Sequence, residues 1–286
     1  MSINIDHIIK SSKEFYPEIN KELSDQITKK YDGGTKTFDQ LNAWKDVELP
    51  ETLLERYEET DSTWITKKEL INLIDLKLAK GTFRPMMPKL IKSNEDEVIE
   101  DTTKSGFQVM LDFFKTHKKE SMDEFWADAT DQDKNEYIDA IEKSMEILCE
   151  LKGVGPASAT LLLSLLVKIS PYLTPPYFSD ESYAFYVVTP YKDDDYKVKY
   201  TTKEYVNELL PVYFEIVAQH PKETMDSLEK GAWAMKNYLV KKDGKLANID
   251  PIFEEDEMDK LSFDEQPVFE GRTAPPPKRK KQKKSK

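Results

Sequence analysis

One short segment constrains this chain more than any other: a turn with two glycines between two helical patterns. It reads Leu151-Lys152-Gly153-Val154-Gly155-Pro156-Ala157. Gly153 and Gly155 can adopt positive φ and, because they lack side chains, they let the backbone approach a ligand closely. Pro156 suits the first turn of the next helix, where its missing N–H costs nothing. The segment therefore predicts a helix-hairpin-helix element whose turn and helix N-terminus suit one phosphate.

Apolar residues recur at helical spacing on both sides of this turn. Residues 137–151 carry them on one face, whereas in residues 157–170 they surround the helix, which predicts a buried central helix. Thr66 and Glu69 form a capping-box pattern that opens a helix ending at Gly81. Further helices are predicted over residues 105–118, 202–220 with an interruption at Pro211, and 225–239. The fold class is all-α, with two helical layers enclosing a cleft near the hairpin.

The composition predicts polar ends around one helical domain. Only 38% of the residues are hydrophobic and 34% are charged, which is a low apolar share for a globular protein. Residues 1–63 are polar and weakly periodic, so we expect a loosely attached extension. Residues 64–246 form the helical domain. Residues 247–286 turn acidic, then rich in proline, then basic, and predict a disordered tail.

Several classes of protein are excluded by what the sequence lacks. Cys149 is the only cysteine, so an internal disulfide, a cysteine zinc site and a four-cysteine iron–sulfur cluster are excluded, and a core thiol is favoured over a nucleophile. The three histidines have no metal-ligand spacing, and we expect neither a metal nor a cofactor. No apolar run of membrane-spanning length and no secretory pattern at the start are present, which predicts a protein that neither spans a membrane nor is exported.

The hairpin resembles that of the base-excision DNA glycosylase superfamily, whose turn reads Leu-Pro-Gly-Val-Gly-x-x-x-Ala. This chain matches from Leu151 to Ala159 except at Lys152, which stands in place of proline. In that family a buried helix, a proline-containing loop and an aspartate that opens the next helix follow. Here the buried pattern ends at Ser170, a loop with three prolines follows, and Asp180 comes next after a somewhat longer loop. The match is specific over residues 137–186.

The resemblance implies a role for each part of this region. Asp180 falls at the catalytic aspartate, where a carboxylate stabilises positive charge at the sugar of a flipped nucleotide or orients the attacking water. Bifunctional members carry a nucleophilic lysine where this chain has Ala157, so Schiff-base strand cleavage is expected to be absent. A second interpretation remains open for Asp180, because an aspartate before Glu181 and Ser182 is also typical of a helix N-cap.

The remaining candidate residues lie on either side of Asp180 and the hairpin. The hairpin residues expected to contact DNA phosphate are Lys152, Gly153, Val154, Gly155 and Ala157. The candidate base pocket consists of Tyr177, Phe178 and Tyr183, although aromatic residues near a core helix are more often core. Residues 77–92 form the most basic stretch of the helical domain, for which a solvated face next to a turn is the plainer interpretation.

The end of the sequence is strongly basic. Its positive residues resemble a nuclear localisation signal, and they are Lys278, Arg279, Lys280, Lys281, Lys283, Lys284 and Lys286. This predicts a nuclear protein that contacts an import receptor, and the alternative is a solubilising or RNA-binding arm. Because the net charge is −12 with these residues included, the rest of the chain is still more acidic and contacts DNA only through a local patch or the tail.

Two hypotheses of function follow. The first is a nuclear DNA-binding protein with a glycosylase-like domain that performs monofunctional base excision through Asp180. The second is a catalytically silent relative, a scaffold or adaptor whose hairpin binds a protein partner. The charge around the hairpin discriminates between them, because a positive rim favours DNA and an apolar or negative rim favours protein.

Overall fold

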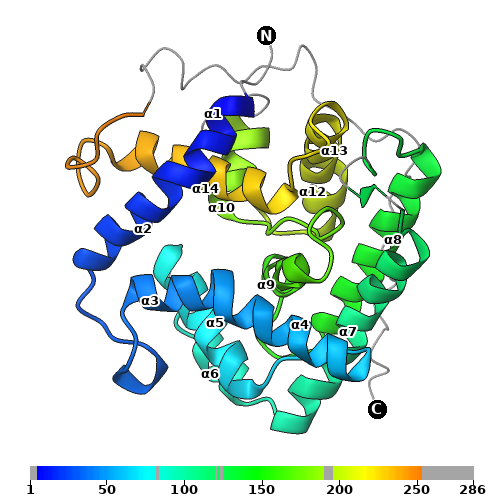
Figure 1. Cartoon of the computed structure of the whole chain (residues 1–286). Coiled ribbons are helices and arrows are strands. Elements are labelled where there is room, and N and C mark those ends of the chain that lie inside the picture. The colour runs from blue at the N-terminus through cyan, green and yellow to red at the C-terminus, as the bar shows by residue number, and fades with distance from the viewer. Residues whose placement is uncertain (1–4, 82–83, 120, 123–124, 190–195, 253–286) are drawn as a thin grey trace, which may run out of the picture.

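The computed structural model describes residues 5–81, 84–119, 121–122, 125–189 and 196–252. Within these ranges the protein is mainly helical, and the one β-type contact is the isolated bridge between Tyr31 and Lys36. Figure 1 shows the helices arranged around α9, with α14 and α13 on one side and α4, α5 and α6 on the other. The predicted all-α class is confirmed for the part of the chain that is described.

The helices have the following bounds. In the first third of the chain they are α1 (Ile5–Lys10), α2 (Tyr16–Asp25), α3 (Phe38–Ala43), α4 (Leu49–Thr60), α5 (Lys67–Lys80) and α6 (Met87–Lys92). The later ones are α7 (Asp96–Thr116), α8 (Asp131–Leu148), α9 (Pro156–Leu163), α10 (Asp180–Tyr183), α12 (Thr202–Glu204), α13 (Leu210–Gln219) and α14 (Met225–Lys241).

Short irregular turns extend or join several of these helices. The π-helical turns are η1 (Ser11–Phe15), η3 (Trp44–Glu48), η6 (Ala184–Val188) and η7 (Tyr205–Leu209). The 3₁₀ turns are η2 (Asp32–Gly34) and η5 (Ser164–Lys168). Pro211 lies in the first turn of α13, directly after η7, so the helix restarts where the proline predicts an interruption.

Two local predictions agree with the structure in detail. The Thr66 hydroxyl accepts a hydrogen bond from the Glu69 backbone N–H, and the Glu69 carboxylate accepts one from the Thr66 N–H, so the capping box forms. At its other end α5 stops at Lys80, with Gly81 as the C-cap. Every residue of α9 after Pro156 is buried, which confirms the central helix. These features depend on local hydrogen bonds and on hydrophobicity, both of which are legible in the sequence.

The prediction that residues 1–63 form a loosely attached extension is wrong. Ile8 and Phe15 are buried in the same core as the rest of the chain, and the ring of Phe15 packs on Tyr238 of α14 at 5.0 Å. Gly231 of α14 has no room for a side chain, because a Cβ there would collide with the backbone of Ile8. The apolar residues of this segment are few and separated by polar ones, so their burial depends on α14, a partner distant in sequence.

The other boundary also shifts. Leu246 and Ile249 are buried, so the folded part of the chain continues past the predicted limit at residue 246. The rest of the predicted tail, residues 253–286, lies outside the described residues. Across the described ranges, no helix combines the length and the apolarity needed to cross a membrane.

Candidate functional site

The hairpin joins α8 to α9 much as its sequence indicates, with one difference at the second glycine. Gly153 has φ +87°, in the left-handed region that favours glycine. Gly155 has φ −122° and ψ −178°, an extended conformation open to any residue, so it does not use the conformational freedom of glycine. The Gly155 carbonyl accepts hydrogen bonds from the N–H groups of Ser158 (2.8 Å) and Ala159 (2.9 Å), and Pro156 opens α9. Gly155 is therefore the N-cap residue of α9.

The hairpin is fixed to α6 through one buried asparagine. The Asn94 side-chain amide donates to the Lys152 carbonyl at 3.0 Å, and its oxygen accepts from the Lys152 N–H at 2.9 Å. A Cβ on Gly153 would lie 3.1 Å from the Leu90 Cβ, which shows how closely the turn packs on α6. No sequence pattern indicates this contact, because Asn94 lies far from the hairpin along the chain.

The candidate phosphate-binding residues divide into two groups. Lys152 is exposed, and Gly153 and Gly155 are partly exposed. Val154 and Ala157 are buried, at 7% and 6% exposure, and their side chains contribute to the core. A ligand can reach the Lys152 side chain and the two glycine backbones at the surface, and Gly155 and Ala157 from the cavity beside the first turn of α9.

A cavity of about 260 Å³ lies beside the first turn of α9. Its walls come from α5, the hairpin, α10, α14 and the N-terminal segment, and the residues with polar or aromatic side chains are Tyr16, Lys45, Lys77, Lys80, Arg84, Ser158, Tyr177, Asp180, Glu181, Lys199, Tyr200, Glu229 and Trp233. Arg84 and Lys199 are exposed, so the mouth of the cavity carries positive charge. Drug-sized ligands typically occupy roughly 300–1,000 Å³, so this cavity suits a single smaller group.

Asp180 lines this cavity and is not the N-cap of its helix. The N-cap of α10 is Ser179, whose hydroxyl accepts a hydrogen bond from the Ser182 N–H at 3.1 Å. Asp180 is the first residue of the helix, and its carboxylate pairs with the Tyr200 hydroxyl. The N-cap interpretation of Asp180 is therefore wrong, and its carboxylate remains at the cavity wall.

Tyr200 holds an unusual backbone conformation next to Asp180. Its φ of +57° is rare for a bulky residue, and such strained positions often cluster at functional sites. Burial, together with the Asp180 carboxylate, raises the pKa of Tyr200 to about 12, so the phenol keeps its proton at neutral pH. The Arg84 guanidinium lies over the ring, 5.0 Å from its centroid. These three side chains form one group at the mouth.

Lys77 reaches the cavity from α5. Its Nζ donates a hydrogen bond to the Ser158 Oγ at 2.7 Å. Burial lowers the pKa of Lys77 to about 8, and the Asp180 carboxylate opposes part of that shift. The sequence placed Lys77 in a basic stretch with a solvated face as the plainer interpretation, because the position of Ser158 relative to α5 is decided only by the fold.

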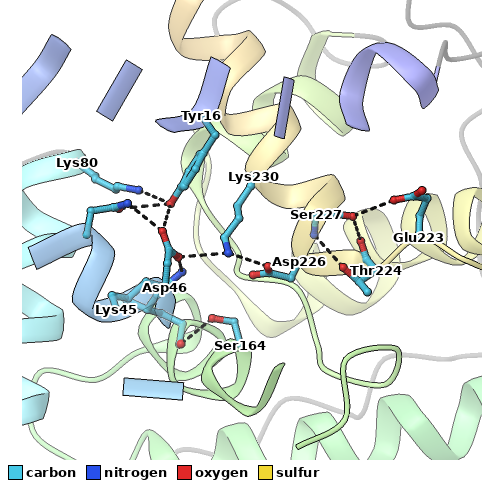
Figure 2. Close-up of polar contacts among 12 residues, drawn as sticks. Tyr16, Lys45, Asp46, Lys80, Ser164, Glu223, Thr224, Asp226, Ser227 and Lys230 are labelled. Carbon is cyan, nitrogen blue, oxygen red and sulfur yellow. Dashed lines mark hydrogen bonds and ion pairs between the residues drawn. The ribbon is translucent and has the colours of Figure 1, made fainter. Parts of the chain in front are cut away.

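A network of buried charges forms the far end of the cavity (Figure 2). The Tyr16 hydroxyl donates to the Asp46 carboxylate at 3.0 Å and accepts from the Lys80 Nζ at 2.8 Å. Asp46 also pairs with Lys45 at 2.9 Å and with Lys230 at 3.3 Å. These lysines hold the pKa of Asp46 well below its usual range, despite the burial that opposes ionisation. The N-terminal segment thus supplies part of the cavity wall.

Lys45 and Lys80 are the basic residues of this network that line the cavity, and Lys80 lies beside two aromatic rings. Its Nζ is 4.6 Å from the ring centroid of Tyr16 and 4.4 Å from that of Trp233. Burial lowers the pKa of Lys80 to about 7, while Asp46 opposes the shift. Glu229 connects this end to α10, because the Ser179 hydroxyl donates to its carboxylate at 2.5 Å. The N-cap that positions Asp180 is therefore itself held by α14.

Only one of the three aromatic residues of the candidate base pocket lines the cavity. Tyr177 lines the cavity, whereas Phe178 and Tyr183 are fully buried at 0% exposure and do not. The Tyr183 hydroxyl donates to Glu208 at 2.8 Å, and the Phe178 ring packs at 5.3 Å from that of Tyr183. Assigning Phe178 and Tyr183 to a pocket was wrong, because both side chains point into the hydrophobic core.

Two other sequence predictions have simpler outcomes. Cys149 is partly buried, and burial raises the pKa of its thiol to about 11, so it is protonated at neutral pH and a poor nucleophile. The candidate nuclear localisation residues from Lys278 onward lie outside the described residues.

No family model, curated protein or solved structure matches this chain.

Proposed function

We propose that this protein is a nuclear DNA-binding protein whose cavity accepts one extruded nucleotide, and that Asp180 promotes excision of the base. The observation that carries the proposal is that Asp180 and the first turn of the hairpin helix α9 line the same cavity. The first turn of α9 suits a phosphate, and Asp180 presents a carboxylate. The order of hairpin, buried helix and aspartate in the sequence supports the same function.

The surface beside the hairpin supports contact with DNA. Lys89 and Lys92 of α6 are exposed, as are Lys152 of the turn and Arg84 at the cavity mouth. This local positive patch attracts phosphate although the net charge is −12. Because few phosphates are engaged, we expect weak duplex binding that falls steeply as the salt concentration rises.

The reaction proposed for the cavity is hydrolysis of the glycosidic bond. As the bond from C1′ to the base breaks, the electron pair leaves with the base and positive charge develops on the sugar. The Asp180 carboxylate stabilises that charge or orients the water that adds to C1′. The base takes up a proton as it leaves, and the product is an abasic sugar with a hydroxyl at C1′. Tyr177 and Tyr200 present aromatic rings in the same cavity for stacking with a base.

The test is Asp180→Asn, assayed on duplexes that carry uracil, alkylated or oxidised bases. After incubation, alkali converts abasic sites into strand breaks. We expect the variant to lose base release while folding and duplex affinity stay close to wild type, because the amide preserves the shape of the carboxylate. Asp101→Asn, on the exposed face of α7, is the matched control. Duplex binding with no base release from a broad lesion panel would contradict the enzymatic part.

One observation favours the second candidate, a catalytically silent adaptor. Met86 and Leu90, on and beside α6, are 62% and 40% exposed next to the hairpin, so the rim is apolar as well as positive. A rim of this kind also suits a protein partner. Loss of all duplex binding at low salt, with the protein folded, would favour the adaptor.

A further inference from the structure

The reaction proposed for the cavity needs a proton donor, because the base takes up a proton as it leaves. Asp180 does not supply that proton, since its part in the reaction requires a charged carboxylate. Glu181, the next residue of α10, also lines the cavity. A second carboxyl group therefore lies at the same wall as Asp180.

The surroundings of the Glu181 carboxyl group favour its protonated form. The titratable groups that face it are Asp180 of its own helix, Tyr177 before that helix, and Glu229 and Lys241 of α14. Among the described residues no basic side chain lies within ion-pair distance of it, and its hydrogen-bond donor is its own backbone N–H. Burial, assisted by Asp180 and opposed by that N–H and by Lys241, raises the pKa of Glu181 to about 7. A substantial share of the group therefore holds its proton near neutral pH.

The other carboxyl groups of the cavity wall are engaged by side-chain donors. The Asp180 carboxylate pairs with the Tyr200 hydroxyl, and the Glu229 carboxylate accepts from the Ser179 hydroxyl at 2.5 Å. Two lysines of the buried network also favour the charged form of Glu229. Glu181 has no side-chain donor in the described part of the chain, so its proton is available to a ligand. Two carboxyl groups held in different environments suit the separate roles of anion and acid.

We propose that the Glu181 carboxyl group donates the proton that the departing base takes up, while the Asp180 carboxylate stabilises the sugar. This inference rests on the proposed function, because it assigns a second group to the same reaction. It also names the substrate class. Bases that are uncharged before excision need a proton in order to leave, whereas a cationic N-alkylated base leaves as a neutral molecule without one.

The step is balanced as follows. As the bond from C1′ to the base breaks, its electron pair goes to the base. The proton of the Glu181 carboxyl group passes to a nitrogen or oxygen atom of the base, and Glu181 becomes a carboxylate. A lone pair of water then forms the new bond to C1′, and the proton that this water loses restores the Glu181 carboxyl group. The sum is one water consumed, with a free base and an abasic sugar formed and nothing oxidised or reduced.

The experiment compares bases that differ in charge before excision. The full chain is incubated under single-turnover conditions with duplexes that carry an uncharged base (uracil, hypoxanthine or 8-oxoguanine) or the cationic 7-methylguanine, and mass spectrometry measures the free base. We expect Glu181→Gln to slow release of the uncharged bases by about a hundredfold or more, the usual contribution of a general acid. Release of 7-methylguanine by the same variant should be unchanged.

The pH dependence of the wild-type rate is a second readout that needs no substitution. Release of an uncharged base should fall by about tenfold per pH unit above about pH 7, where Glu181 loses its proton. The residual release by Glu181→Gln should not show this fall. A wild-type rate that stays constant above pH 7 would overturn the role of Glu181, even where the variant does not fold.

Two carboxyl variants serve as controls. Glu58→Gln, at an exposed position of α4, should match the wild type on every substrate. Glu229→Gln should slow release of all bases alike, because Glu229 holds the N-cap that positions Asp180. The same uniform loss in Glu181→Gln would show a structural role and overturn the inference. Release of 7-methylguanine alone by the wild type would overturn it and leave the proposed function standing, whereas no release of any base would overturn both.

Discussion

The Asn94 side chain forms two hydrogen bonds with the Lys152 backbone: its oxygen accepts from the N–H at 2.9 Å, and its NH₂ group donates to the carbonyl at 3.0 Å. Through this pair α6, a helix with two exposed lysines, holds the hairpin in a fixed position. The positive patch and the glycine turn thereby act as one surface.

Replacing Asn94 should destabilise the protein and loosen the hairpin. Asn94→Ala removes four hydrogen bonds at a buried site, two to the Lys152 backbone and two to the carbonyls of Leu90 and Ile91. It leaves the Lys152 backbone groups without this partner, so we expect a loss of about 1–3 kcal/mol in the free energy of unfolding. Chemical denaturation measures it, with the exposed Asn248→Ala as control. An equal and small effect of both substitutions would show that the pair does not hold the turn.

The two hairpin glycines should respond differently to alanine. Gly153→Ala places a Cβ on a residue with φ +87° and 3.1 Å from Leu90, so a loss of about 1–2 kcal/mol is expected. Gly155→Ala meets open space in an extended conformation and should leave stability nearly unchanged.

A bulkier residue at position 155 separates folding from binding. Gly155→Val should fold like the wild type and weaken duplex binding, because its side chain stands on the cavity wall beside the first turn of α9. Fluorescence anisotropy with labelled duplex at low salt measures the affinity. Unchanged affinity would show that the hairpin is not the contact.

The buried carboxylate of Asp46 should make the free energy of unfolding depend on pH in the acid range. The pKa of Asp46 is lower in the folded protein than the ordinary value of 3.8. Its contribution to the free energy of unfolding is therefore fully present above pH 3.8 and is lost progressively as the pH falls below that value. Asp46→Asn leaves Lys45 without its ion-pair partner and Lys230 paired with Asp226 alone, and should cost about 3–5 kcal/mol at neutral pH. Unfolding followed from pH 7 to pH 2 should show the gap between variant and wild type closing at low pH. A gap that is constant with pH would contradict the ion-pair explanation.

The basic residues near the end of the sequence should direct the protein to the nucleus. Deletion of residues 278–286 from a fluorescent fusion should shift the signal to the cytoplasm, since this is the densest basic run in the chain. The control replaces the same residues with an established import signal and should restore nuclear signal. Unchanged nuclear retention after deletion would assign the segment another role.

The sequence by itself determined the local features of this protein. The capping box at Thr66, the restart of a helix at Pro211 and the burial of α9 all depend on residues within a few positions of one another, or on hydrophobicity alone. Gly153 also adopts the positive φ that glycine permits. Such features follow from short-range sterics and hydrogen bonding, which a sequence pattern records directly.

The tertiary structure alone decided which of these elements meet at the cavity. Lys77 and Ser158, Tyr16 and Asp46, and Asn94 and Lys152 are brought together by helix packing, and no spacing in the sequence indicates their contacts. The same packing gave the N-cap role to Ser179 and buried Phe178 and Tyr183 in the core. Long-range contacts depend on the summed burial of many apolar side chains, so the positions of polar residues relative to one another emerge only when the whole core has formed.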